Sequence, residues 1–458
     1  MTRPRSADTS RPLEPSSVAK ETPSGAARGG SLWSSSWGSA PGLRGVLSTM
    51  TVMCALGALI GCGPTPEPPA TGSSLAPGSW RATLASPGGA ITFGLDLEES
   101  EEGLRAVLVN GSERQPAGVL EAAGEQIRFK IPPYRSALVA TPDPDGRGLT
   151  GYWERDVGEG PVPLMPFAAV AGTDARPPAR PDPAAQEALS GRWRVRFEGD
   201  GEDAIGLFEV APTGRASGTF LTTLGDYRYL NGWFDGEALR LACFDGAHAF
   251  LFEARLGVGG DLSGDFWSRD SFHTTWTATR DETARLPDDF ALTRWTEGED
   301  LDGLGFPDLN GEPRALSELL PADSPGLLVI FGTWCPNCND LTETLVELQR
   351  RHPSLHIVGL AFELGADPAK HREAVRGYIA HHGITYPVLL GGSASKALAS
   401  EALPILDCVR AYPTTVFLAK DRRPTAVHTG FSGPATGQRY EALVERFESE
   451  IESLIGSR

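Results

Sequence analysis

An internal repeat restricts the fold of this chain more than any other feature. Residues 75–172 and 187–283 both consist of short alternating apolar and polar segments separated by Gly and Asp turns, a pattern that predicts antiparallel strands and hairpins. Gly78 and Trp80 correspond to Gly191 and Trp193, an offset of 191 − 78 = 113 positions. Nearly the same offset relates IRF at 127–129 to LRL at 239–241, and LTGYW at 149–153 to LSGDFW at 262–267. A duplicated antiparallel β unit is the simplest account.

The architecture of each β unit stays open between a barrel and a sandwich. The Gly-x-Trp at the start of each stretch resembles the opening of lipocalin-like barrels, and a sandwich fits the strand pattern almost as well. Aromatic residues at 225–230 and 244–252 are expected to form a core rather than to line a cavity. Cys243 is expected to be a small buried apolar residue, and His248 has no metal-ligand partner nearby in sequence.

Charge and composition narrow the possible functions. The chain has 458 residues, enough for several domains, with 41 Lys and Arg against 59 Asp and Glu, so its net charge is −18. A chain this acidic is expected not to bind nucleic acid, since its surface repels phosphates. The 54 Gly and 37 Pro residues favour turns over long helices and indicate a large β component.

The N-terminal 74 residues are predicted to direct and anchor the protein. Residues 1–43 are too poor in large apolar side chains to fold, and residues 44–62 have the pattern of a secretory signal peptide. The LIGC sequence that ends at Cys62 resembles the lipobox of bacterial lipoproteins, which implies acylation of Cys62. Residues 63–74 would then form a tether. The resemblance implies a lipid anchor in the bacterial cell envelope, facing the periplasm, with the choice between inner and outer membrane open.

Two alternatives remain for this region. The apolar segment before Cys62 could be a short transmembrane anchor, although its length is marginal for a bilayer. A signal peptide normally begins with a short basic segment, so translation is predicted to start at Leu43, directly before Arg44; a genuine extension over residues 1–43 is the alternative.

The C-terminal region has a different pattern. A Pro-rich linker is predicted at 173–186, and after residue 298 strands alternate with helices, which predicts an α/β domain over residues 298–458 with helices on both faces of its sheet. The fold class is therefore multidomain, with duplicated all-β units followed by an α/β domain. Its strands are predicted at 327–331, 355–362, 386–390, 414–418 and 426–431, and its helices at 336–351, 368–382 and 437–454.

Cys335 and Cys338 lie where the first of these strands meets the first helix. Two thiols separated by two residues at a helix start can close a disulfide without unwinding the helix. Cys335, at the open end, is exposed to the helix dipole and to unpaired N–H groups that stabilise a thiolate, whereas Cys338 lies one turn inside. We therefore expect Cys335 to attack a substrate disulfide and Cys338 to resolve the mixed disulfide, with the Cys335–Cys338 pair as the redox centre and no other cofactor. Half of a zinc site is the alternative, but Cys243 and Cys408 are isolated and supply no second ligand pair.

Three segments of this region resemble the TlpA-like (redoxin) group of thioredoxin-fold, envelope thiol-disulfide oxidoreductases. They are FGTWCPNC at 331–338, GLAFE at 359–363 and YPTTVF at 412–417. The resemblance implies a thioredoxin-like fold, a cis peptide bond before Pro413, and a position for Pro413 facing the two cysteines. It also implies exchange with protein thiols and disulfides of the envelope, and a membrane thiol as electron donor. The supporting residues that it implies are Trp334, Pro336, Asn337, Glu363, Tyr412 and Thr414.

Departures from the family pattern leave the proton path and the reaction class partly open. Leu341 stands where many members have a Glu, so proton transfer to and from Cys338 is expected to depend on Glu363, on water or on another group. A peroxiredoxin-like enzyme is disfavoured, because the positions that need Pro and Thr or Ser hold Leu328 and Gly332. Cys408 is either a third thiol near the site or a bystander. A β lipoprotein that binds a ligand or a protein and uses the thioredoxin fold as a scaffold is the alternative from a different functional class.

Overall fold

The computed structural model describes residues 75–172, 180–199 and 201–456, and all of these belong to one compact unit, residues 48–458. The predicted extension, the signal peptide with Cys62, the tether and the first half of the linker lie outside the described residues. Within the described part of the chain, no helix is long and apolar enough to cross a lipid bilayer.

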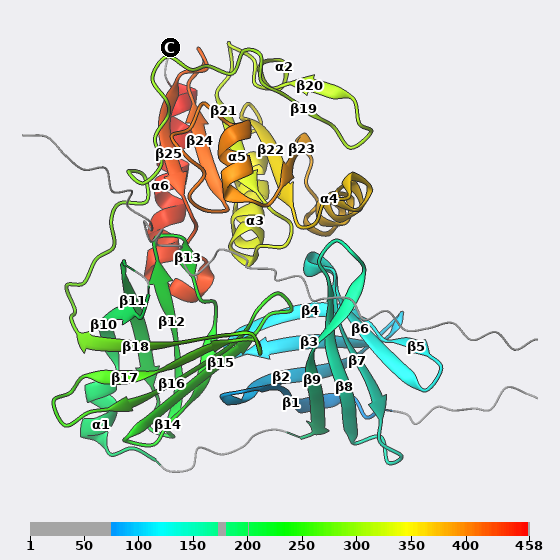
Figure 1. Cartoon of the computed structure of the whole chain (residues 1–458), viewed down its shortest axis with the longest axis vertical. Coiled ribbons are helices and arrows are strands. Elements are labelled where there is room, and N and C mark those ends of the chain that lie inside the picture. Colours follow the sequence, from blue (N-terminus) through cyan, green and yellow to red (C-terminus); the bar gives the residue numbers. More distant parts are fainter. Residues whose placement is uncertain (1–74, 173–179, 200, 457–458) are drawn as a thin grey trace, which may run out of the picture. The chain divides into compact units, whose positions relative to one another are not determined.

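The first β unit is a nine-stranded antiparallel sheet in which the first strand pairs with the last (Figure 1). Its order is β4-β3-β2-β1-β9-β8-β7-β6-β5, so all neighbouring pairs apart from β1 and β9 are consecutive in the chain. Alternate residues of the strands point inward, as Trp80, Ala82 and Leu84 do in β1. The strands are β1 (Gly78–Ser86), β2 (Gly89–Ser100), β3 (Gly103–Asn110), β4 (Glu113–Val119), β5 (Glu121–Ala123), β6 (Gln126–Ile131), β7 (Ser136–Pro142), β8 (Gly148–Asp156) and β9 (Pro161–Ala171), with a 3₁₀ turn η1 (Pro132–Tyr134).

The second β unit is a closed barrel. Its sheet runs β11-β10-β18-β17-β16-β15-β14-β12-β13, and an additional pairing of β11 with β12 completes the ring. Stacked aromatic rings fill the inside: the centroid of Phe252 lies 4.4 Å from that of Phe220 and 4.2 Å from that of Phe266. These aromatic residues therefore form a core, as expected. The strands are β10 (Gly191–Phe197), β11 (Asp203–Val210), β12 (Arg215–Thr222), β13 (Gly225–Asp226), β14 (Leu230–Phe234), β15 (Ala238–Phe244), β16 (Ala249–Leu256), β17 (Leu262–Ser268) and β18 (Phe272–Arg280).

Equivalent residues make equivalent contacts in the two β units. The indole N–H of Trp80 donates to the carbonyl four residues earlier at 3.2 Å, and that of Trp193 does the same at 2.9 Å. Gly151 in β8 and Gly264 in β17 both lie against the neighbouring strand, where a methyl group would come within 1.9 and 1.8 Å of a carbonyl oxygen. These two positions therefore require glycine, and the shared geometry supports a duplication.

The linker between the two units is shorter than predicted. Helix α1 (Pro183–Leu189) occupies the end of the segment predicted as linker. Asp182 caps it by accepting a hydrogen bond from Ala185 N at 2.8 Å, and Leu189 is fully buried. The Pro-rich composition concealed a short helix, because proline is well tolerated at a helix start.

The C-terminal domain contains a five-stranded sheet in the order β23-β22-β21-β24-β25. Strands β21, β22 and β23 are parallel, whereas β24 and β25 run antiparallel to their neighbours. The small hairpin β19–β20 and helix α2 were not predicted from the sequence. The elements are β19 (Gly305–Pro307), β20 (Pro313–Ala315), α2 (Leu316–Leu319), β21 (Gly326–Phe331), α3 (Pro336–Arg351), β22 (His356–Glu363), α4 (Pro368–His382), β23 (Val388–Ser393), α5 (Lys396–Ala402), β24 (Thr414–Leu418), β25 (Pro424–Thr429), η2 (Pro434–Thr436) and α6 (Gln438–Gly456).

The last strand differs from its predicted range. β25 was expected to reach residue 431 but ends at Thr429. Gly430 adopts a φ of 77°, and its N–H donates to Pro413 O at 2.8 Å, which turns the chain away from the sheet. The turn carries residues 430–433 towards the start of α3.

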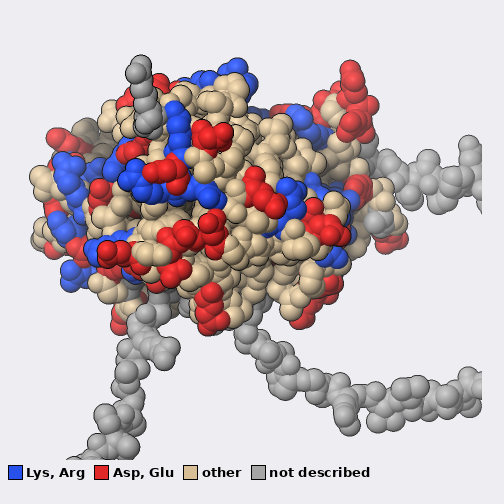
Figure 2. Space-filling view, turned by 90° about the horizontal axis from the view of Figure 1, so that it is seen from above, with Lys and Arg blue, Asp and Glu red and all other residues tan. Residues whose placement is uncertain are grey.

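The visible surface is mixed in charge. On the face shown in Figure 2, acidic and basic side chains are interspersed over the described residues. Such a distribution is typical of the surface of a folded protein.

Candidate dithiol site

The dithiol lies at the junction of β21 and α3. Cys335 is the N-cap residue of α3 and has an extended backbone, and the N–H groups of Cys338 and Asn339 point at its carbonyl oxygen from 3.1 and 3.2 Å. Both cysteines are free thiols, joined to one another by a side-chain hydrogen bond. Cys335 is 4% exposed and Cys338 is 1% exposed. Burial, followed by the hydrogen bond with Cys335, raises the pKa of Cys338 well above its ordinary value.

The loop before β24 forms the opposite wall of the site. The peptide bond between Tyr412 and Pro413 is cis, and the thiol of Cys335 donates a hydrogen bond to Tyr412 O at 3.4 Å. The rings of Trp334 and Tyr412 meet edge to face, with centroids 5.6 Å apart. Thr414 is fully buried, and its hydroxyl donates to a backbone carbonyl of the same loop, so it holds the loop in place.

Trp334 and Glu363 connect the dithiol to the end of β22. The indole of Trp334 donates to Phe362 O at 2.9 Å. A methyl group on Gly332 would lie 2.3 Å from that indole nitrogen, so glycine is required at this position. Glu363 is buried and accepts hydrogen bonds from the N–H (2.9 Å) and the hydroxyl (2.7 Å) of Thr333. Burial raises the pKa of Glu363 to about 7 although these hydrogen bonds lower it.

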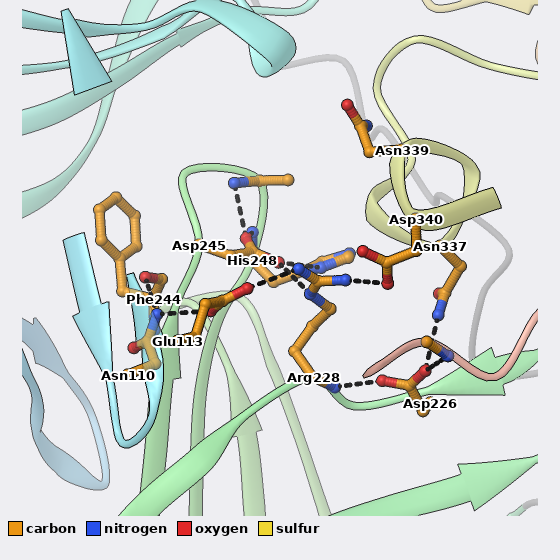
Figure 3. Close-up of polar contacts among 12 residues, drawn as sticks. Asn110, Glu113, Asp226, Arg228, Phe244, Asp245, His248, Asn337, Asn339 and Asp340 are labelled. Atoms are coloured by element: carbon orange, nitrogen blue, oxygen red, sulfur yellow. Dashed lines mark hydrogen bonds and ion pairs between the residues drawn. The ribbon is translucent and has the colours of Figure 1, made fainter. Parts of the chain in front are cut away.

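Asn337, between the two cysteines, is held by one residue of the α/β domain and by one residue of the second β unit (Figure 3). Its amide N–H₂ donates to Phe431 O at 3.1 Å and to the Asp226 carboxylate at 3.2 Å. The same carboxylate accepts the N–H of Gly433 at 2.6 Å. Asp226 belongs to β13 of the second β unit, and burial raises its pKa to about 6. The loop over residues 430–433, to which the sequence assigned no role, therefore joins the dithiol helix to the second β unit.

A buried ion cluster around Arg228 lies beside this contact (Figure 3). Arg228 follows β13 and pairs with Asp340 of α3, with Glu113 of β4 at 2.7 Å and with Asp245 at 3.7 Å. One guanidinium thus contacts carboxylates from the α/β domain and from both β units. Asp340 lies two residues after Cys338 in the chain, and its carboxylate forms this ion pair with Arg228.

The residues predicted for the dithiol site lie together. Cys335, Cys338, Trp334, Asn337 and Glu363 gather around the β21–α3 junction, with Pro336 as the first residue of α3 and Tyr412, Pro413 and Thr414 opposite. Cys62 lies outside the described residues. Cys408 is a free, half-buried thiol. It shares a charged neighbour with the dithiol, because the charges of both Cys335 and Cys408 raise the pKa of Lys396, which burial lowers.

Sequence reasoning missed Asp226, Arg228 and the other residues that the β units contribute. Asp226 contacts Asn337 across 111 positions, and Arg228 contacts Asp340 across 112. Spacing along the chain carries no signal for partners this distant. Cys243 is fully buried, as expected, and His248 stacks on Phe250 with centroids 4.7 Å apart.

In the part of the chain that the structure describes, the residues that could hold a metal ion do not include the two cysteines. Among the described residues, one group of three side chains has its ligand atoms close enough to hold a metal ion: His352, Glu448 and Glu452. Neither Cys335 nor Cys338 belongs to it.

Comparison with protein-family models and with curated proteins finds no match. Solved structures of similar fold include a secreted Mycobacterium tuberculosis disulfide oxidoreductase homologous to E. coli DsbE, at 18% identity, 33% of this chain, 95% of that chain and a TM-score of 0.25. A putative thiol:disulfide interchange protein DsbE from Chlorobium tepidum is 15% identical over 34% of this chain and 99% of that chain, with a TM-score of 0.27. A DsbF homologue from Corynebacterium diphtheriae is 21% identical over 34% of this chain and 92% of that chain, with a TM-score of 0.26. These likenesses cover about a third of the chain, so the chemistry of the site is inferred from its own geometry.

Proposed function

We propose that this chain is a thiol-disulfide oxidoreductase that works through Cys335 and Cys338. The observation that carries the proposal is the pair of free thiols in the first turn of α3, with Cys335 at the N-cap and Cys338 behind it. A thiolate at the N-cap is stabilised by the helix dipole, while the buried inner thiol keeps its proton until it is needed.

The reaction proceeds in two exchange steps. The thiolate of Cys335 attacks one sulfur of a substrate disulfide, forms a mixed disulfide and releases the other sulfur as a thiolate. Cys338 then loses its proton and attacks the sulfur of Cys335, which forms the Cys335–Cys338 disulfide and releases the second substrate thiol. Two electrons pass to the substrate, and the reverse sequence oxidises a dithiol.

Glu363 is the candidate proton acceptor for Cys338. Burial mainly raises the pKa of Cys338, and the charge of Glu363 raises it further; burial also raises the pKa of Glu363 itself to about 7. A group with a pKa near neutral both accepts and returns a proton at physiological pH. This role replaces that of the Glu which the TlpA-like pattern places at the position of Leu341.

Insulin reduction by the purified full chain with dithiothreitol tests the proposal. Cys335→Ser should abolish turnover, and Cys338→Ser should accumulate mixed disulfides with the substrate. Cys408→Ser is the matched control and should retain activity. Turnover by both single variants would refute the dithiol mechanism. A chain inactive towards disulfides would favour the β ligand-binding scaffold, and consumption of hydroperoxide through Cys335 would favour a peroxiredoxin.

We also propose that the protein is anchored in the bacterial envelope through acylated Cys62, where it exchanges disulfides with envelope proteins and receives electrons from a membrane thiol. The LIGC sequence at residues 59–62 supports this proposal. Labelling with a fatty acid should mark the wild-type protein and not Cys62→Ala. An intact mass that retains residues 1–61 on an unmodified chain would contradict the lipid anchor and favour the transmembrane alternative.

A further inference from the structure

Arg155 is a buried cation beside the dithiol. It lies near the end of β8 in the first β unit and is 7% exposed. Its guanidinium donates to Tyr134 O at 3.3 Å, to Ala247 O at 3.1 Å and to Trp334 O at 3.0 Å. The last contact brings a full positive charge to the residue that precedes Cys335.

These three hydrogen bonds of Arg155 all go to neutral carbonyl oxygens. Its neighbour Arg228 differs, because three carboxylates surround it. Carbonyl oxygens satisfy N–H groups but do not neutralise a charge, and a buried charge without a counter-ion is costly. Burial and the nearby Arg269 accordingly lower the pKa of Arg155 to about 10.

The charged and titratable groups that face Arg155 are Arg269, Tyr134, Asp245, Glu363 and Cys335. Arg269 carries the same charge, and Tyr134 is buried with a pKa raised well above its ordinary value, so it stays neutral. Asp245 already pairs with His248 and Arg228. Glu363 accepts both hydrogen bonds of Thr333, and burial raises its pKa to about 7, so it is mostly protonated below neutral pH. The charge of Cys335 favours the charged form of Arg155 and also that of Lys396.

We propose that Arg155 is the counter-ion of the Cys335 thiolate, so that the first β unit completes the dithiol site. This inference rests on the proposed function and goes beyond it, because it makes a residue 180 positions away part of the electrostatics of the reacting sulfur. Ionisation of Cys335 releases its proton to solvent and leaves the thiolate next to the guanidinium. The pair stabilises the reduced protein, and a stabilised reduced form makes the dithiol a stronger oxidant.

The test compares Arg155→Gln with Arg155→Lys in the full chain. The readout is the rate at which iodoacetamide alkylates Cys335 at pH 7, followed by peptide mass spectrometry. Loss of the positive charge of Arg155 should raise the pKa of Cys335 and slow its alkylation at least about tenfold. The Lys variant keeps the charge and should recover most of the rate. If Arg155→Gln destabilises the reduced form tenfold, its reduction potential should fall by about 30 mV, as measured against a glutathione buffer.

Arg240→Gln is the matched control. Arg240 is a partly buried arginine on β15 that pairs with Glu253, and its removal should leave alkylation of Cys335 unchanged. Alkylation of Arg155→Gln at the wild-type rate would overturn the proposal. Equal losses in the Gln and Lys variants, with equal losses of thermal stability, would overturn it too, since they would show a packing role.

A second measurement needs no change at Arg155. The NMR signal of its Nε–H group should shift when Cys335 ionises or enters the disulfide, and this shift should be absent in Cys335→Ser. A signal that does not respond would refute the pairing. Neither alkylation nor NMR requires turnover, so failure of insulin reduction with a clear Arg155 effect would refute the proposed function and leave the counter-ion intact.

Discussion

Replacement of Glu363 by Gln should change how the stability of the α/β domain depends on pH. The carboxylate of Glu363 is buried, and burial raises its pKa from 4.5 to about 7. A difference of about 2.5 between the unfolded and folded pKa values is worth about 3 kcal/mol. Because the folded pKa is raised, the folded state binds the proton more tightly: the penalty for ionisation is absent below pH 4.5, develops between pH 4.5 and 7, and is complete above pH 7. Gln cannot ionise and avoids this penalty.

Pulsed alkylation of Cys338 measures the stability of the α/β domain, which also contains Glu363. Cys338 is 1% exposed, so a reagent reaches it only when the α/β domain opens. Samples equilibrated in urea at pH 5 and pH 8, and pulsed at a common pH, report the free energy of opening. Between these two pH values the wild-type protein should lose up to about 3 kcal/mol that Glu363→Gln keeps.

Glu445→Gln provides the control, because Glu445 is an exposed acid on α6 of the same domain. It should reproduce the wild-type dependence on pH. The reasoning fails if Glu363→Gln and the wild type lose the same free energy between pH 5 and pH 8, since the buried carboxylate would then ionise with an ordinary pKa.

Three further variants test buried contacts of the second β unit, two of them with the dithiol helix. Arg228→Ala leaves its carboxylate partners, Asp340 among them, without a cation and should cost about 3–5 kcal/mol in thermal or urea unfolding, and more than Asp340→Asn. Gly225→Ala adds a methyl group 2.8 Å from Asn337 Oδ1 at a φ of 147°, so it should cost about 1–3 kcal/mol and speed alkylation of the dithiol. Trp193→Phe removes one buried indole hydrogen bond and should lower stability by about 1 kcal/mol by the same assays. Wild-type stability in any of these variants would contradict the corresponding contact.

The α/β domain was largely predictable, because its information is local. Strand β21 is a continuous apolar run, and α3 begins at a Cys-Pro step that suits a helix start, so both were expected at nearly their observed bounds. The end of β25 was not predicted, because the turn at Gly430 depends on a hydrogen bond to the distant Pro413. The repeat predicted two related β units but could not distinguish a barrel from a sandwich, since closure depends on the pairing of β11 with β12.

The burial of the polar residues at the start of α3 could not be predicted from the local sequence. Asn337, Asn339 and Asp340 follow one another within a turn, and in a lone domain such residues would be expected to face water. All three are buried here. The β units supply Asp226 as a partner for Asn337 and Arg228 for Asp340, whereas Asn339 bonds to Cys335 O and His382 within the α/β domain. A polar run at a helix start is therefore ambiguous in sequence, because a solvated face and a polar interface look the same.

This burial sets a condition for exchange with a protein disulfide. Attack requires the sulfur of Cys335 to approach a substrate sulfur in line with the disulfide bond, yet Cys335 is only 4% exposed. The groups beside it are held by hydrogen bonds and ion pairs, chiefly those of Asp226, Arg228 and Arg155. Separation of the β units from α3 would remove Arg155 from the side of this sulfur. A bulky substrate that separated them would thus meet a Cys335 that is less ionised, whereas a substrate slim enough to enter the closed site would meet the thiolate with its counter-ion in place.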